Sequence, residues 1–350
     1  MQRTVEGCTA IMDIDSKGKK RICLILPFFV CGGGKFNNYF PLFLQSCEYN
    51  HTINWLIITD SQQQYSWPSN VRVLHSSFDD FKKKVEKCFP FEISLDTPYK
   101  LCDYKPAYGE ILESELEGFD FWGHCDCDLI FGDIRSFLSE DILDKYDKFF
   151  SRGHLTIYRN IPEINSFYRK QTYLPYNVVF SSRDIFAFDE WAGVSIAWYN
   201  EGRPIYDELI MDDIRVGMKG FHPTKEISNS TSPYRKYHDS NMSKAYRRMK
   251  HTCYFFDEGQ LYRVWIEDNR EIKKQPVLYV HFQKRKMDVK LDSISGRYMI
   301  ANDTFYPAIG LSVGNLKKMT GRDFSWNNNW NNFKNSIHPL LHFVRKIVHR

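Results

Sequence analysis

The sequence predicts an α/β protein with a mostly parallel central sheet flanked by helices. Continuous apolar runs of strand length recur along the first 135 residues, and segments of helical pattern separate them. Uninterrupted apolar runs are typical of strands buried on both faces. Strands that alternate with helices favour a parallel sheet. The runs cover residues 21–29, 53–60, 71–77 and 118–131.

The remaining elements follow from the same patterns. A glycine-rich turn leads into a helical pattern at 31–50, and residues 78–89 predict a helix with lysines on its outer face. The second half is less regular, so we expect an irregular C-terminal region. Its patterns predict strands at 154–160, 176–182, 253–268 (with a turn at Glu258-Gly259) and 276–283, and helices at 189–202 and 206–218.

Composition limits the class of protein. The chain has 350 residues, of which 43% are hydrophobic and 26% charged, so a full core is expected. A net charge of +4 is too small to favour nucleic-acid binding. The nine cysteines are scattered, which indicates reduced thiols in a cytosolic protein. No stretch fits a signal peptide or a membrane span, so we expect a cytoplasmic protein.

Two aspartates end the last of the four apolar runs, in the segment GHCDCDLIFGD. In an extended chain Asp126 and Asp128 point to the same side, where they can bind one Mg²⁺ or Mn²⁺ ion and through it a phosphate. A solvated strand end is the plain alternative. Zinc held by His124, Cys125 and Cys127 is another, but no second ligand pair follows at zinc-site spacing.

Asp60 ends the strand at 53–60 and can accept hydrogen bonds from a nucleobase or ribose. It can equally cap the helix that follows. Phe28 and Phe29, at the end of the first strand, can stack on a base. Together these residues suit the base and ribose of a nucleotide.

The segment KLCDYKPAYG, residues 100–109, places charges before a proline-started helix. A lysine there, Lys105 in particular, can neutralise phosphate, and Asp103 either caps the helix or binds ribose. In YVHFQKRKM, residues 279–287, His281 can complete a metal site beside Lys284, whose charge suits a diphosphate. A structural histidine is the alternative.

Two acidic pairs lie further along the chain, Asp189-Glu190 and Asp212-Asp213. Either can supply a carboxylate base for an acceptor hydroxyl, which an inverting transfer reaction requires. Both pairs also suit the first turn of a helix, where acids are favoured by the helix dipole.

The segments YKLCDYKPAYG and FDFWGHCDCDLIFGDI resemble the GT-A glycosyltransferases, in particular the glycosyltransferase-like proteins of bacterial capsule, exopolysaccharide and lipopolysaccharide clusters. The similarity is clear over about residues 20–135. It implies one catalytic domain over 20–320, with a nucleotide-sugar half to 135 and an acceptor half from 136. It also implies roles for single residues: metal ligands Asp126, Asp128 and His281, nucleoside contacts Asp60 and Asp103, and a donor contact Lys105.

The resemblance implies a metal-dependent glycosyltransferase of the hexosyltransferase type. Its cofactor would be Mn²⁺ or Mg²⁺, its donor a UDP-sugar and its acceptor a lipid-linked oligosaccharide in surface-polysaccharide synthesis. Two other classes stay open from the residues alone. One is a metal-dependent phosphoesterase or nucleotidyltransferase, and the other is a sugar-binding module without catalysis.

The C-terminal segment 321–350 ends in an amphipathic pattern, with Leu340, Phe343, Val344 and Ile347 at helical spacing and several cationic residues. Such a helix can lie on the anionic inner face of the cell membrane, where a lipid-linked acceptor would be found. A helix docked on the protein's own core is the alternative.

Overall fold

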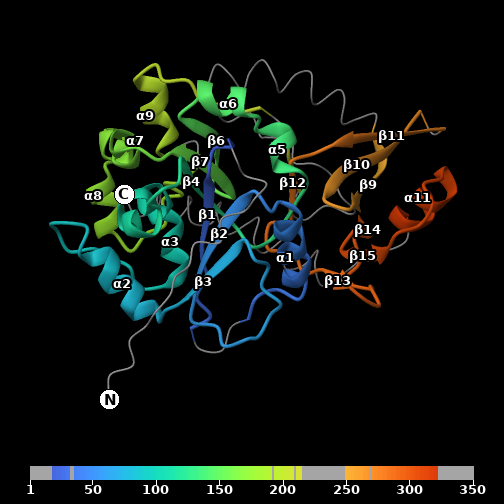
Figure 1. Cartoon of the computed structure of the whole chain (residues 1–350), viewed down its shortest axis with the longest axis horizontal. Helices are drawn as coiled ribbons and strands as arrows, with labels where there is room; N and C mark the ends of the chain where they lie inside the picture. The colour runs from blue at the N-terminus through green and yellow to red at the C-terminus, as the bar shows by residue number, and fades with distance from the viewer. Residues whose placement is uncertain are drawn as a thin grey trace, which may run out of the picture.

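The computed structural model of the chain describes residues 18–31, 35–190, 193–208, 210–214, 249–268 and 270–321. Within these residues the strands form two six-stranded sheets and one three-stranded sheet. Figure 1 shows the first sheet at the centre of the molecule and the second, in orange and red, at one side of it. The predicted amphipathic helix of the C-terminal tail lies outside the described residues.

The first sheet has the strand order β3-β2-β1-β4-β7-β6. Strands β3, β2, β1 and β4 run parallel, while β7 and β6 join antiparallel at one edge. The α/β class is confirmed, but the sheet is mixed, because β6 and β7 form a hairpin instead of being connected by a crossover helix. The strands are β1 Ile22–Pro27, β2 Ile53–Thr59, β3 Val71–His75, β4 Phe121–Cys125, β6 Lys148–Arg152 and β7 Leu155–Arg159.

Helices cover both faces of this sheet. Alternate residues of β1 belong to two different cores, with Ile25 in one and Leu24 in the other, as expected for a strand buried on both sides. The first core includes residues of α2 Phe78–Glu86, α3 Leu101–Tyr104, α4 Tyr108–Ile111, α7 Pro162–Asn165, α8 Tyr176–Ser181 and α9 Ser195–Asn200. The second includes residues of α1 Phe40–Tyr49, α5 Ile134–Phe137 and α6 Glu140–Lys145. No helix in the described ranges is long and apolar enough to cross a membrane.

The second sheet corrects the expectation of an irregular C-terminal region. Its order is β11-β10-β9-β14-β15-β13, and all its pairings are antiparallel except that of β13 with β15. The predicted turn is confirmed, since Glu258 and Gly259 join β9 to β10 with φ of 48° and 89°. The elements are β9 Lys250–Asp257, β10 Gln260–Glu267, β11 Glu271–Pro276, β13 Asp288–Val289, β14 Arg297–Ala301, β15 Thr304–Pro307 and α11 Val313–Thr320.

A small third sheet, β5-β12-β8, contains segments far apart in the sequence. Its strands are β5 Leu129–Phe131, β8 Asp212–Asp213 and β12 Tyr279–His281. The predicted single strand at 118–131 is therefore two strands, and the described part of the predicted helix at 206–218 contains a strand. The predicted strand at 176–182 is wrong too, because these residues form α8.

Lys148 of β6 is a buried lysine that lies beside Tyr158 of the first core. Its side chain is fully buried, donates a hydrogen bond to the carbonyl oxygen of Phe150, and lies over the Tyr158 ring. Burial lowers the pKa of Lys148 to about 7, although Asp207 and Asp189 oppose this. The ammonium form is therefore costly in the folded chain.

We expect Lys148→Met to remove a pH dependence of stability. Between pH 7 and about 10.4 the unfolded chain binds a proton that the folded chain lacks, so the free energy of unfolding rises with pH across this window. At pH 6 the variant should be more stable by up to roughly 4 kcal/mol, and the difference should shrink toward pH 10. Urea unfolding at pH 6, 8 and 9.5 checks this, and parallel pH profiles of the two proteins would contradict it.

Candidate functional site

The carboxyl ends of β1, β2 and β4 lie at one edge of the first sheet, because these strands are parallel. Ligands of α/β sheets bind at this edge. Asp60 directly follows β2, and Asp126 directly follows β4. Since β4 ends at Cys125, the segment from Asp126 to Asp128 is a loop before β5, not the extended strand that the spacing predicts. The two carboxylates nevertheless each bring an oxygen within 4.8 Å of the other and of His281.

Lys105 joins Asp126 to Asp189. Its Nζ lies 2.8 Å from Asp126 Oδ1 and 3.2 Å from Asp189 Oδ2, and it donates to the Gly153 carbonyl oxygen at 2.7 Å. Asp189 is 3% exposed, and burial raises its pKa to about 7 although Lys105 opposes the rise. Asp189 is thus a carboxyl that can gain or lose a proton near neutral pH.

Asp128 faces His281 of β12. Asp128 Oδ1 lies 3.4 Å from His281 Nε2, and Asp128 Oδ2 accepts a hydrogen bond of 2.6 Å from the Lys284 backbone N–H. Burial disfavours the Asp128 carboxylate, but the charge of His281 and the N–H of Lys284 lower its pKa to about 2. Burial likewise disfavours the imidazolium, yet Asp128 and Asp213 hold the pKa of His281 well above its ordinary value.

Asp126, Asp128 and His281 each offer a ligand atom within 4.8 Å of the others. The two carboxylates are the oxygen ligands that Mn²⁺ and Mg²⁺ take, and the imidazole adds a nitrogen ligand that suits a transition metal better than Mg²⁺. Lys105 and His281 balance the charges of the two aspartates. The three ligands predicted from sequence therefore come together from the β4–β5 loop and from β12.

His154 and Asp213 lie beside the same histidine. The His154 ring stacks on that of His281 with centroids 4.4 Å apart, and Asp213 Oδ1 lies 2.9 Å from His281 Nδ1. These three residues form a second group of potential ligands. Sequence reasoning did not find His154, which no motif marks, and considered Asp213 only as a base. Asp212, its partner in the predicted acidic pair, is fully enclosed in a bidentate ion pair with Arg263.

Asp189 and Glu190, the predicted candidates for the catalytic base, lie against Gly153. A Cβ at Gly153 would come within 2.6 Å of Asp189 Oδ2 and 3.2 Å of Glu190 Cγ, so only glycine fits there without movement. Asp189 is buried and Glu190 is exposed. Asp189 is consequently the one in contact with Lys105.

The predicted nucleoside contacts have different surroundings. Asp60 Oδ1 accepts a hydrogen bond of 2.6 Å from Val30 N–H, and its Oδ2 lies 3.5 Å from the Cys31 thiol. Phe28 is half-buried and stacks on Phe36, with centroids 4.3 Å apart. Asp60 therefore fixes the loop that follows β1 through Val30, and within the described residues its second oxygen, Oδ2, contacts only the weakly donating Cys31 thiol.

The prediction that Asp103 contacts the nucleoside does not fit its surroundings. It is 0% exposed, pairs with Lys100 at 2.8 Å, and accepts hydrogen bonds from the backbone N–H groups of Phe186 and Phe188. These partners occupy the carboxylate, so it is not open to a ligand. Lys284, in contrast, is exposed, and its Nζ lies over the Tyr99 ring, 4.0 Å from the centroid.

A zinc site at His124, Cys125 and Cys127 finds no support. Among the residues that the structure describes, neither group of convergent ligands contains a cysteine. His124 is fully buried, and burial together with Lys105 lowers its pKa well below the ordinary value. His124 is thus a neutral core residue.

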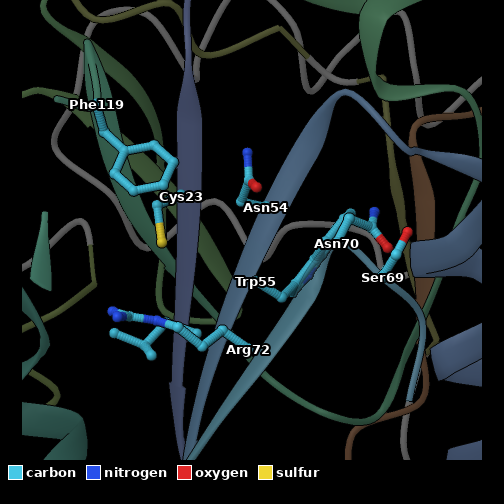
Figure 2. Close-up of a pocket in the computed structure, with 8 residues that line it drawn as sticks. Cys23, Asn54, Trp55, Ser69, Asn70, Arg72 and Phe119 are labelled. Carbon is cyan, nitrogen blue, oxygen red and sulfur yellow. The ribbon is translucent and has the colours of Figure 1, made fainter. Parts of the chain in front are cut away.

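A cavity of about 100 Å³ lies at the opposite end of the sheet. Figure 2 shows Cys23, Asn54 and Asn70 among its lining residues, and these lie at or just before the amino ends of β1, β2 and β3. Asn70 donates to three backbone carbonyls and Arg72 pairs with Glu115, so these groups already have partners. The cavity is separate from the carboxylate site.

Fold and site together define a mixed α/β protein with an Asp/His group that can hold a metal at the carboxyl ends of its strands. The chain belongs to DUF6625, a family of unknown function, whose model matches residues 24–309. No curated protein matches the sequence.

Several solved structures to which the chain is similar are glycosyltransferases. The galactosyltransferase LgtC with donor and acceptor sugar analogues is 12% identical, with 75% of this chain and 87% of that chain covered and a TM-score of 0.37. Mouse xyloside xylosyltransferase 1 is 9% identical, with 76% and 98% covered and a TM-score of 0.36. GlyE of Streptococcus pneumoniae TIGR4 is 11% identical, with 42% and 35% covered and a TM-score of 0.24.

Proposed function

We propose that this protein is a metal-dependent glycosyltransferase that moves a sugar from a UDP-sugar to an acceptor hydroxyl. The convergence of Asp126, Asp128 and His281 beside Lys105, at the carboxyl ends of parallel strands, carries the proposal. A bound Mn²⁺ or Mg²⁺ ion would supply stabilisation of the negative charge that develops on the departing nucleoside diphosphate. Lys284, exposed beside Asp128, supplies a further cation for that diphosphate.

Asp189 is the proposed base of an inverting reaction. Its pKa near 7 lets it take the proton of the acceptor hydroxyl. The hydroxyl oxygen then forms a bond with the sugar's anomeric carbon, and the bond from that carbon to the diphosphate oxygen breaks, with its electron pair leaving on the diphosphate. Lys105 holds Asp189 and Asp126 within reach of one another. Glu190 is the second proposed carboxylate at this position.

The acceptor is proposed to be a lipid-linked oligosaccharide in bacterial surface-polysaccharide synthesis, at the inner face of the membrane. This part rests on the sequence resemblance to proteins of capsule and lipopolysaccharide clusters. The arrangement of Asp126, Asp128 and His281 beside Lys105 supports only the part of the proposal that concerns the sugar donor.

A phosphoesterase or nucleotidyltransferase with two metals is less well supported. Such sites hold two ions about 4 Å apart with separate sets of ligands. Both ligand groups within the described residues depend on His281. A single metal beside a diphosphate fits this arrangement better.

We expect UDP to bind more tightly than GDP or CDP in the presence of Mn²⁺. In the part of the chain that the structure describes, Asp60 Oδ2 accepts only a weak hydrogen bond, from the Cys31 thiol at 3.5 Å, which the N3–H of uracil can replace, whereas cytosine carries no hydrogen at N3. Calorimetry with the three nucleotides measures the preference, which should be at least tenfold over CDP. A clear preference for GDP would overturn the choice of base.

The proposed activity is tested with a panel of nucleotide sugars. Each is incubated with the protein and Mn²⁺, and release of the nucleoside diphosphate is measured with and without EDTA. Selective, EDTA-sensitive hydrolysis of one UDP-sugar is the expected result. Release of inorganic phosphate or of a nucleoside monophosphate instead would indicate the phosphoesterase class, and binding without hydrolysis would indicate a sugar-binding module.

A further inference from the structure

His281 is placed between two carboxylates, one on each nitrogen of its ring. Nε2 faces Asp128 Oδ1 at 3.4 Å, and Nδ1 faces Asp213 Oδ1 at 2.9 Å. Only Asp128 belongs to the ligand group with Asp126. Asp213 therefore contacts the side of the ring that points away from the proposed metal position.

The three-stranded sheet sets this arrangement. His281 of β12 pairs with Leu129 of β5 on one side and with Asp213 of β8 on the other. Asp128 directly precedes Leu129, and its carbonyl oxygen accepts from the Phe282 N–H. Pairing of three strands from distant parts of the chain thus brings Asp128, His281 and Asp213 into neighbouring positions.

The turn that follows β12 holds both carboxylates. Gln283 and Lys284 have φ of 50° and 58°, a left-handed conformation that is uncommon for residues other than glycine. In this turn the Gln283 amide donates to both oxygens of Asp213 at 2.7 Å, while the Lys284 N–H donates to Asp128. The backbone strain has an evident role, because the same turn fixes both carboxylates against the ring.

We propose that Asp213 is the positioning residue of His281, held in turn by Gln283. Asp213 accepts the Nδ1–H, which fixes the tautomer and the ring plane and leaves the Nε2 lone pair for the metal. Carboxylates that hold a ligating histidine in this way typically change metal affinity 10- to 100-fold when removed. The inference rests on the proposed function and names a residue that the metal would not touch.

The test measures Mn²⁺ affinity directly, by the electron paramagnetic resonance signal of free Mn²⁺ in titrations of the whole chain. Asp213→Ala should weaken Mn²⁺ binding by 10- to 100-fold. Asp213→Asn, which keeps an oxygen acceptor for Nδ1–H, should weaken it less. Asp128→Ala, which removes a proposed ligand, should weaken it most.

A matched control separates positioning from direct ligation. His154 and Asp213 could instead bind the ion together with His281. The double variant His154→Phe, Tyr279→Phe keeps an aromatic ring at both positions but removes the ligand nitrogens of His154 and its 2.8 Å hydrogen bond with Tyr279 Oη. We expect it to bind Mn²⁺ as tightly as the wild type does.

The outcomes distinguish this inference from the proposed function. Normal Mn²⁺ affinity in Asp213→Ala, with only a lower melting temperature, would overturn the positioning role. Loss of affinity in the double variant would overturn it as well, in favour of direct ligation. A wild-type protein that binds Mn²⁺ and responds to Asp213→Ala, yet hydrolyses no nucleotide sugar, would overturn the function and leave the inference standing. A wild type without Mn²⁺ binding would overturn both.

Discussion

Replacing Asp128 with alanine is expected to abolish donor hydrolysis and to lower the stability of the fold. A metal ion at a leaving group supplies several kcal/mol of transition-state stabilisation, so the loss of a ligand should reduce the rate at least 100-fold. The variant is measured by release of UDP from the preferred donor at saturating Mn²⁺. Activity within tenfold of the wild type would contradict a metal-dependent reaction at this site.

The expected change in stability follows from the contacts of Asp128. From the sequence alone, Asp126 and Asp128 are expected to repel each other. Removing one of them would then leave the stability of the fold unchanged or slightly higher. In the structure, His281 and the Lys284 N–H stabilise the Asp128 carboxylate and lower its pKa to about 2 from an ordinary 3.8. The group therefore stabilises the fold by roughly 2 kcal/mol above pH 4, and this contribution is lost as the pH falls through 2.

Asp128→Asn and Asp133→Ala serve as controls. The asparagine keeps an acceptor for the Lys284 N–H, so it should lose activity with a smaller loss of stability. Asp133, five residues further on, caps α5 by accepting from Ser136 N–H at 3.2 Å. Its replacement should cost about 1 kcal/mol of stability and leave hydrolysis unchanged.

Local patterns predicted the parallel strands and the place of the site. Long apolar runs such as 53–60 indicate buried parallel strands. The residue that follows such a strand lies at its carboxyl end, where ligands of α/β sheets bind. The turn at Glu258-Gly259 could be predicted for a similar reason, since Gly259 suits the positive φ of a tight hairpin turn. Asp126, Asp128 and His281 could be predicted as a candidate metal site because carboxylate and imidazole side chains at strand ends suggest one, and the structure brings them together.

Non-local contacts explain the parts that were wrong. Residues 206–218 have apolar residues at helical spacing, yet Asp212 and Asp213 form a strand because β12 pairs with them. Asp103 looks like a ligand by its place before a helix, but the chain at 186–188 folds over it and uses its oxygens. His154 lies in no motif, and only the β6–β7 hairpin brings it against His281.

Replacing Lys105 with methionine is expected to have the largest effect on stability. Lys105 Nζ contacts Asp126, Asp189 and the Gly153 carbonyl oxygen, all within 3.2 Å. Its removal leaves the buried Asp189 carboxylate without a cation, and breaking a buried ion pair from one side typically costs about 3–5 kcal/mol. Urea unfolding measures this loss, and donor hydrolysis should be lost with it, because Asp126 and Asp189 no longer share a partner.

A second replacement separates the electrostatic cause from lost packing. In Lys105→Met, Asp189→Asn no buried charge remains unpaired, so most of the lost stability should return while hydrolysis stays absent. Lys82→Met is the surface control, since Lys82 pairs with Asp96 only at 3.7 Å and its loss should change stability by less than about 1 kcal/mol. If the double variant is no more stable than Lys105→Met, Lys105 stabilises the fold through its packing. The ion pair between Lys105 and Asp189 would then not be the source of the lost stability.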